Sequence, residues 1–492
     1  MTAPIPPIGT QFSLLAGKAP DEPAVTCGGR TLTRRELDTS TNRLARAYAE
    51  LGVRQGDYVT IVLPNSIEWM QAALAAWKLG AVPQPLSARL PDAELKDLLE
   101  LRPRALLVGR DDPLGVIPSV PGDFTPDAGL SDAPLPEAVS PTWKALGSGG
   151  STGRPKLIEA GGDGRFPGAY AGVPMGAQEG DTQLIAVPLS HNTGMTTATI
   201  GLLLRQHLVL MPRFDAAAFL RLITDHRVDF VVAVPTMMQR LLPVYRADPD
   251  AYDLSSIRRL WHVGAPCPPA VKESWIELLG PEAVWELYGG TELQAIAVLS
   301  GTQWLEHPGS VGSVVAGEMK VLDDDGNECP PGVAGEIYMR PSPGSPPTYR
   351  YVGATAQTRD GWDSLGDLGY FDSDGFLYLN DRRVDMFTVG GRNVYPAEIE
   401  SALSAHPNVL SCLVVGVPDD GVGDLGQVPY AIVQADGLDA AAVTAFLSER
   451  IAAYKVPRTV EFSDTPLRDD AGKARRSAVR DEIIARRAQA RL

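Results

Sequence analysis

The strongest constraint on the fold is a repeated alternation of short β-branched runs with amphipathic segments. In the first hundred residues, apolar runs bounded by glycine or proline alternate with stretches whose apolar residues recur at helical spacing. The segments are residues 32–51 (helix), 56–65 (strand), 66–80 (helix), 81–87 (strand), 91–102 (helix) and 105–109 (strand). Strands joined through helices pair in parallel, so we predict βαβ units with helices covering a sheet.

Two further changes in the sequence pattern divide the rest of the chain. The alternation returns at residues 215–292 and predicts a second α/β lobe. From residue 309 onward, short strands with Asp-Gly and Pro-Gly turns are typical of antiparallel β structure and indicate a small β-barrel-like part. A smaller α+β unit follows, with a basic tail at its end. We predict an α/β protein with an N-terminal core domain (residues 1–381) and a C-terminal domain (residues 382–492).

Composition excludes several classes of protein. The 492 residues are 44% hydrophobic and 21% charged, which is ordinary for a soluble globular protein. A net charge of -16 argues against nucleic acid as a main partner, although it allows a nucleotide substrate. We find no signal peptide and no run of about 20 apolar residues, so we expect a cytoplasmic protein without integral membrane association. The four cysteines have no metal-binding or disulfide spacing: Cys27, Cys267, Cys329 and Cys412.

A glycine-rich stretch, GSGGSTGRPK, occupies residues 147–156. Such tracts are usually linkers, but this one is short, lies between apolar segments and carries hydroxyls and cations at fixed places. Backbone amides, hydroxyls and a lysine suit a phosphate chain. The candidate phosphate-binding residues are Ser148, Gly149, Gly150, Ser151, Thr152, Gly153 and Lys156. The glycine-rich stretch is not the P-loop of NTPases, because Lys156 follows Pro155 and the next residues are expected to form a strand.

The loop resembles the phosphate-binding signature of the adenylate-forming superfamily, which includes acyl-CoA synthetases, nonribosomal peptide adenylation domains and firefly luciferase. The family usually has Ser-Gly-Thr-Thr-Gly-x-Pro-Lys, and Gly149 replaces the usual serine here. Later segments resemble further family motifs in the family order: HVGAP, VWELYGGTE, SLGDLGYFDSDGFLYLNDRRVDMFTVGGRNVYPAEIE and YKVPRTVEFSDTPLRDDAGKARRSAVRD. Alone, each of these segments also fits an ordinary turn or a solvated charge. Their order and spacing favour the family.

The VWELYGGTE segment has the residues that this resemblance assigns to ATP and magnesium. Tyr288 would pack against adenine with Gly289 beside it, Thr291 would contact the α-phosphate, and Glu292 would bind Mg²⁺. A carboxylate oxygen is a ligand that a hard divalent cation prefers.

Three more parts of the nucleoside site follow from the resemblance. Gly264, Ala265 and Pro266 would form a flat wall beside adenine. Asp367 would accept hydrogen bonds from both ribose hydroxyls, and Arg382 would add a contact from the junction between the domains.

The resemblance implies a two-step reaction. A carboxylic acid would attack the α-phosphorus of ATP, and Lys473 would bridge the carboxylate and the α-phosphate. The C-terminal domain would be a mobile lid that rotates to admit a thiol, by default coenzyme A, along a tunnel lined by Gly390 and Gly391. The hinge position, commonly Asp or Lys in the family, is Val384 here.

The acid is expected to be hydrophobic: fatty, aromatic or polycyclic. The segment PLSHNTGM resembles that of acyl- and aryl-CoA ligases and lacks the aspartate that would pair an amino-acid ammonium. His191 either gates the acyl tunnel or is structural. The candidate pocket residues are His191, Met195, Val234, Met237 and Gln294.

Two alternatives to a coenzyme A ligase stay open. A stand-alone enzyme could load a separate carrier protein, or the chain could be a non-catalytic nucleotide-binding regulator. We expect a monomer or a homodimer.

Overall fold

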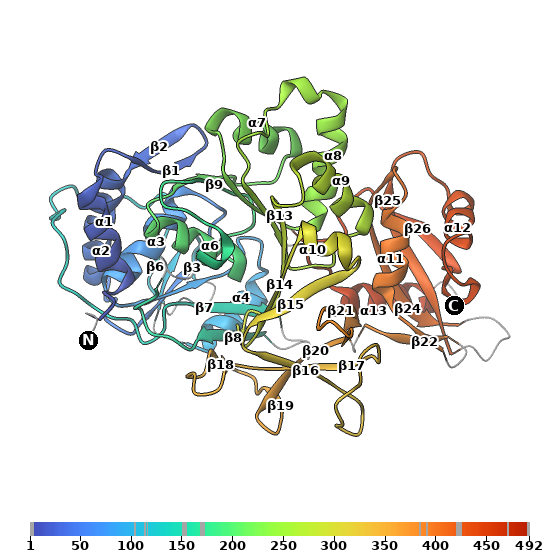
Figure 1. The fold of residues 1–492 in the computed structure, drawn as a ribbon. Coiled ribbons are helices and arrows are strands. Elements are labelled where there is room, and N and C mark those ends of the chain that lie inside the picture. Colours follow the sequence, from blue (N-terminus) through green and yellow to red (C-terminus); the bar gives the residue numbers. More distant parts are fainter. Residues whose placement is uncertain are drawn as a thin grey trace.

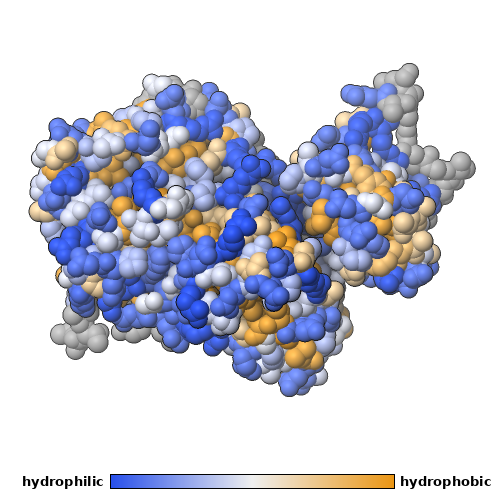
Figure 2. All heavy atoms as spheres, turned by 90° about the horizontal axis from the view of Figure 1, so that it is seen from above, coloured by the Kyte–Doolittle hydropathy of each residue, from blue (hydrophilic) through white to orange (hydrophobic). Residues whose placement is uncertain are grey.

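The computed structural model describes residues 4–102, 105–112, 115, 117–149, 155–167, 173–382, 385–389, 392–419, 426–469 and 472–489. It is a mixed α/β structure with a large N-terminal domain and a smaller C-terminal domain (Figure 1). Seen from above, the C-terminal domain projects from the larger body, with a notch between them (Figure 2).

The first lobe is a parallel sheet in the order β4-β3-β5-β6. Its helix α2 begins with a capping box, in which the Thr33 hydroxyl accepts from the backbone N–H of Glu36 and the Glu36 carboxylate accepts from that of Thr33. The elements are α1 (Ile8–Lys18), α2 (Arg34–Glu50), β3 (Tyr58–Ile61), α3 (Ile67–Lys78), β4 (Val82–Pro85), α4 (Asp92–Glu100), β5 (Ala105–Val108) and β6 (Ser119–Val120).

The second lobe is a parallel sheet in the order β1-β10-β9-β11-β12-β13, with β2 antiparallel at its edge. Phe219, Met238 and Trp275 from three of its helices share one buried core. The elements are β1 (Pro23–Cys27), β2 (Arg30–Thr33), β9 (Thr182–Ile185), α6 (Asn192–Leu203), β10 (His207–Leu210), α7 (Ala216–His226), β11 (Phe230–Ala233), α8 (Pro235–Ala247), β12 (Arg259–Val263), α9 (Pro269–Leu279) and β13 (Val284–Tyr288).

An antiparallel β-rich part continues directly from β13, in the order β14-β15-β21-β20-β17-β16. A separate sheet, β18-β8-β7, lies beside it. The elements are β7 (Ala145–Gly149), β8 (Pro155–Ala160), β14 (Ile296–Ser300), α10 (Gly301–Glu306), β15 (Ser310–Ala316), β16 (Glu318–Leu322), β17 (Gly335–Arg340), β18 (Tyr349–Val352), β19 (Gln357–Arg359), β20 (Trp362–Phe371) and β21 (Leu377–Arg382).

The C-terminal domain has its own core, formed by the sheet β24-β25-β26 and its helices. The elements are β22 (Phe387–Val389), β23 (Arg392–Val394), α11 (Pro396–Ser404), β24 (Val409–Pro418), β25 (Gln427–Ala435), α12 (Ala440–Ser448), β26 (Thr459–Phe462) and α13 (Arg476–Gln489). Among the described residues, no helix is long and apolar enough to cross a membrane.

The structure confirms the predicted α/β class, including both α/β lobes and the antiparallel part that follows them. The basic tail, for which no element was predicted, is largely the helix α13, which buries Ile483 against β24 and β25. The domain boundary at residues 381 and 382 stays a prediction.

Candidate active site

Three parallel strands end at one edge of the second lobe. The neighbouring strands β11, β12 and β13 are followed by Val234, by the Gly264–Pro266 loop and by Gly289. Gly264 has a φ of +81°, a backbone conformation that favours glycine. Ligands of α/β proteins bind at the carboxyl ends of parallel strands, so this edge is the place to look for a site.

A hydrogen bond joins two of the predicted ATP-binding residues. The hydroxyl of Tyr288, at the end of β13, donates to Oδ2 of Asp367 on β20 at 2.7 Å. Asp367 is in turn paired across the ladder with Arg382 on β21; the Arg382 side chain lies outside the described residues. Tyr288 and Asp367, which are 79 residues apart in the sequence, therefore meet through their side chains, and the backbone of Arg382 lies across the ladder from Asp367.

The turn after β13 holds a buried carboxylate. Glu292 is 6% exposed, and its Oε1 accepts a hydrogen bond from the hydroxyl of Tyr351 at 2.5 Å. The next residue, Leu293, has a φ of +52°, which is strained for a leucine and is typical of functional turns. Thr291 is half-buried in the same turn.

The arrangement around Glu292 fits a divalent cation. Among the described residues, no lysine or arginine forms an ion pair with this buried carboxylate. Burial, together with the hydrogen bond to Glu292, raises the pKa of Tyr351, so its phenol remains a neutral donor. A carboxylate oxygen held this way would suit Mg²⁺.

The strands that flank the glycine-rich loop approach the same place. The loop joins two strands, as predicted, and these pair antiparallel, with Ser148 opposite Lys156 and Gly149 opposite Pro155. Strand β8 also pairs with β18, and Nζ of Lys156 lies 3.7 Å from the ring centroid of Tyr351. The rest of the loop lies outside the described residues: Gly150, Ser151, Thr152 and Gly153, together with the side chain of Ser148.

The turn that carries Lys473 reaches the N-terminal domain. A Cβ added at Gly472 would lie 3.3 Å from Cβ of Val234, the residue that follows β11. The side chain of Gln239 on α8 also donates to the backbone carbonyl of Val409 on β24 at 2.9 Å. Lys473 is exposed and adjacent to the edge where the three strands end.

The predicted acyl-pocket residues lie in different surroundings. Met195 is buried in the core of the first lobe, whereas Val234 and Met237 belong to the core of the second. His191 is half-buried at the start of α6. Gln294 donates to Oδ2 of Asp363 at 2.7 Å. Their membership of one pocket stays a prediction.

Sequence reasoning missed a polar group beside Glu292. Tyr349 and Tyr351 alternate on β18, and the hydroxyl of Tyr349 donates to the same Asp363 oxygen as Gln294, at 2.7 Å. The period-two pattern TYRY was the available signal, because it puts both phenols on one face of a strand.

Comparison with known proteins decides the family. The family model of AMP-binding enzymes matches residues 12–141 and 146–349, and the model of the AMP-binding enzyme C-terminal domain matches residues 398–473. The chain belongs to the AMP-binding enzyme family. The predicted resemblance is thereby confirmed.

Relatives within the AMP-binding enzymes align over nearly the whole chain. The 2-succinylbenzoate–CoA ligase of Bacillus licheniformis is 32% identical, covering 93% of this chain and 96% of that protein. A fatty acid–[acyl-carrier-protein] ligase of Streptomyces coeruleorubidus is 31% identical, covering 96% and 95%. The o-succinylbenzoate CoA synthetase of Bacillus subtilis, solved with its acyl-adenylate intermediate, has a TM-score of 0.82 at 29% identity and covers 97% of this chain and 98% of that one.

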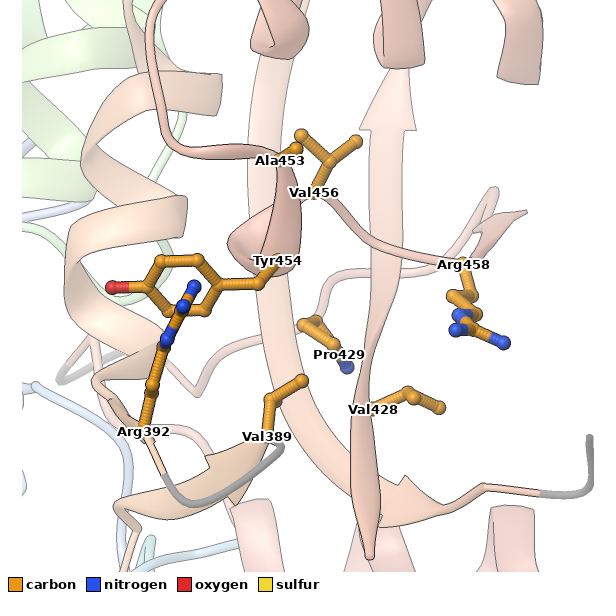
Figure 3. Close-up of a pocket in the computed structure, with 8 residues that line it drawn as sticks. All are labelled: Val389, Arg392, Val428, Pro429, Ala453, Tyr454, Val456 and Arg458. Carbon is orange, nitrogen blue, oxygen red and sulfur yellow. The ribbon is translucent and has the colours of Figure 1, made fainter. Parts of the chain in front are cut away.

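The predicted hinge residue Val384 and the predicted thiol-tunnel residues Gly390 and Gly391 lie outside the described residues. The residues on either side of the two glycines, Val389 and Arg392, line a cavity of about 330 Å³ in the C-terminal domain (Figure 3). The guanidinium of Arg392 lies 5.0 Å from the ring centroid of Tyr454, and Arg458 lines the opposite side.

Proposed function

We propose that this enzyme activates a hydrophobic carboxylic acid as its acyl-adenylate and transfers the acyl group to coenzyme A. It is an AMP-forming acid–CoA ligase that uses ATP and Mg²⁺. One observation carries the assignment of the site: Tyr288, Glu292 and Asp367 gather at the carboxyl edge of β11, β12 and β13, within reach of the phosphate-loop strands.

In the first half-reaction, an oxygen of the substrate carboxylate attacks the α-phosphorus. The bond from that phosphorus to the oxygen bridging to the β-phosphate breaks, and pyrophosphate leaves. Lys473 holds the attacking carboxylate against the α-phosphate, and Lys156 with its loop holds the departing phosphates. The contribution of these groups is positioning and neutralisation of charge. Glu292 would hold Mg²⁺, which would supply further neutralisation of the phosphate oxygens when it is bound.

The nucleoside is held by groups of the N-terminal domain. Tyr288 stacks on adenine, and Asp367 accepts from the ribose hydroxyls. The 2.7 Å bond between these two side chains supports the roles, because adenine and ribose are adjacent parts of one ligand.

In the second half-reaction, the thiol of coenzyme A attacks the acyl carbon and AMP leaves. We place the nucleotide end of coenzyme A at the cavity beside Val389 and Arg392. Two guanidiniums, Arg392 and Arg458, suit its phosphates, and the apolar wall suits its adenine.

A hydrophobic acid is supported by the residues after β9. The segment PLSHNTGM contains no carboxylate that could pair a buried substrate ammonium. The similarity to a ligase whose name specifies 2-succinylbenzoate supports an aromatic acid over an amino acid.

The test is pyrophosphate release across a panel of benzoates, cinnamates, straight-chain fatty acids and steroid acids, with phenylalanine as the amino-acid comparison. With the best acid, Lys473→Ala should lower the rate by about 10²-fold or more, because the group that aligns the two reactants is lost. ATP binding, measured by calorimetry, should remain.

Lys18→Ala is the matched control, since Lys18 is exposed at the end of α1, and it should keep the wild-type rate. A wild-type rate of pyrophosphate release from Lys473→Ala would contradict the lysine assignment.

One finding favours a carrier protein as a second possible acceptor of the acyl group: the similarity to an acyl-carrier-protein ligase. Supplying coenzyme A or a phosphopantetheinylated carrier protein in the same thioester assay separates the two. We expect turnover with coenzyme A, and turnover with the carrier protein alone would overturn that choice.

A further inference from the structure

One buried carboxylate of the C-terminal domain binds the two arginines on either side of the Gly472–Lys473 turn. Glu400 of α11 is 7% exposed. Its Oε2 accepts from Nη2 of Arg468 at 2.7 Å and from Nη2 of Arg476 at 2.6 Å. Its Oε1 accepts from the backbone N–H of Val414 on β24 at 2.8 Å. The carboxylate is therefore fixed by three donors.

The first arginine holds the turn itself. Nη1 of Arg468 donates to the carbonyl of Gly472, the residue before Lys473, at 3.3 Å. The turn is closed by Asp469, whose Oδ1 accepts from the backbone N–H of Lys473 at 2.9 Å. Gly472 has a φ of +75° and lies against Val234. A shift of Arg468 would move the backbone that carries Lys473.

The second arginine connects the cluster to the start of the C-terminal domain. Nη1 of Arg476 is 3.3 Å from Oδ2 of Asp385, which follows the predicted hinge residue Val384. Asp385, Glu400, Arg468 and Arg476 balance two negative against two positive charges, and each side chain is less than 20% exposed. Removal of one charge would leave the others partly buried and unbalanced.

We propose that Glu400 is the positioning residue that sets Lys473 for adenylation. By clamping Arg468 and Arg476, it fixes the lysine turn against Val234 and links that turn rigidly to Asp385 at the hinge. The inference rests on the proposed role of Lys473. It predicts that loss of the Glu400 charge impairs the half-reaction that uses Lys473 and spares the one that does not.

The experiment measures the two half-reactions separately in the full-length enzyme. The first is acid-dependent pyrophosphate release, and the second is thioester formation from coenzyme A and the chemically prepared acyl-adenylate. Glu400→Gln, which keeps the shape and removes the charge, should lower the first rate about 10²-fold and keep the second within about threefold. Arg476→Lys, which retains a cation near Glu400, should retain more of the first rate than Arg476→Met.

Glu461→Gln is the matched control. Glu461 also pairs with an arginine of α13, Arg486, at 2.5 Å, and it accepts from the hydroxyl of Tyr430 rather than from the arginines that flank the lysine turn. It should leave both rates at the wild-type level.

The outcomes separate this inference from the proposed function. Equal losses in both half-reactions of Glu400→Gln, or no loss in either, would show a structural role and overturn the inference while Lys473→Ala still fails in adenylation. A fully active Lys473→Ala would instead overturn the proposed role of the lysine, and the inference with it.

Discussion

The turn from Gly290 to Leu293 shows how single residues shape the candidate site. A Cβ at Gly290 would lie 2.4 Å from Cδ1 of Leu365 and 2.7 Å from Oε2 of Glu292. Both neighbouring atoms are ends of flexible side chains. A side chain at this position would therefore displace the Glu292 carboxylate more than it would disturb the fold.

Gly290→Ala is accordingly expected to lower acid-dependent pyrophosphate release by about tenfold or more, and to raise the Mg²⁺ concentration needed for half-maximal rate. The free energy of unfolding should fall by about 1–3 kcal/mol, which is the usual cost of adding a methyl group to a packed site. Mg²⁺ titrations and thermal melts measure the two effects. Gly17→Ala, at a position with no atom within 4 Å of the added carbon, is the control. An unchanged Mg²⁺ dependence in Gly290→Ala would contradict the metal role of Glu292.

His207 predicts how stability depends on pH. Burial, with smaller contributions from His226 and Arg34, lowers the pKa of His207 from 6.5 to about 4. Between these values the unfolded chain binds more protons, so the free energy of unfolding falls as the pH drops from 6.5 to 4.

His207→Gln cannot titrate, and it keeps a polar group beside the hydroxyl of Thr26, which lies 2.7 Å from Nε2 of His207. Its free energy of unfolding should change less between pH 6.5 and 4.5 than that of the wild type, as measured by urea unfolding. Identical changes in the two proteins would show that His207 does not account for this loss.

At the scale of elements, the sequence predicted most helices and strands with a clear hydrophobic period, but it missed α6, α13 and α1. Helix α6 mixes threonines with apolar residues and is buried over most of its surface, so it has no amphipathic face to detect. Helix α13 was missed because its many arginines made the segment resemble a solvated basic tail, although Val479 and Ile483 are spaced as on one helix face. Helix α1 has the same kind of signal in Ile8, Phe12 and Ala16, which are all buried.

Ile483→Ala tests whether α13 is an integral part of the C-terminal domain. Ile483 is 2% exposed and packs with Val415, Val428 and Tyr430. Its truncation should cost the domain about 2–5 kcal/mol, because a cavity replaces buried apolar atoms. Differential scanning calorimetry should show the C-terminal transition at a lower temperature. Glu482→Ala, at the exposed neighbouring position, should leave the temperature of this transition unchanged. An unchanged transition temperature in Ile483→Ala would mean that α13 is not packed as described.

At the scale of the whole molecule, the order of the motifs allowed the family to be predicted, but not the contacts between distant positions. Tyr288 with Asp367 and Glu292 with Tyr351 meet because β13, β18 and β20 are brought together by sheet topology, which spacing along the chain does not encode. The meeting of Gly472 with Val234 similarly depends on how two domains dock.

In the proposed function, Glu292, Asp367 and Lys473 act on one ATP molecule to make a mixed anhydride of the acid and AMP. The most direct test uses the best acid of the panel with ¹⁸O in its carboxylate, together with ATP, Mg²⁺ and coenzyme A, and reads the products by mass spectrometry. Attack of the carboxylate on the α-phosphorus predicts AMP that carries one ¹⁸O, with unlabelled pyrophosphate. Label in inorganic phosphate with ADP as the nucleotide product, or AMP without label, would contradict the claim.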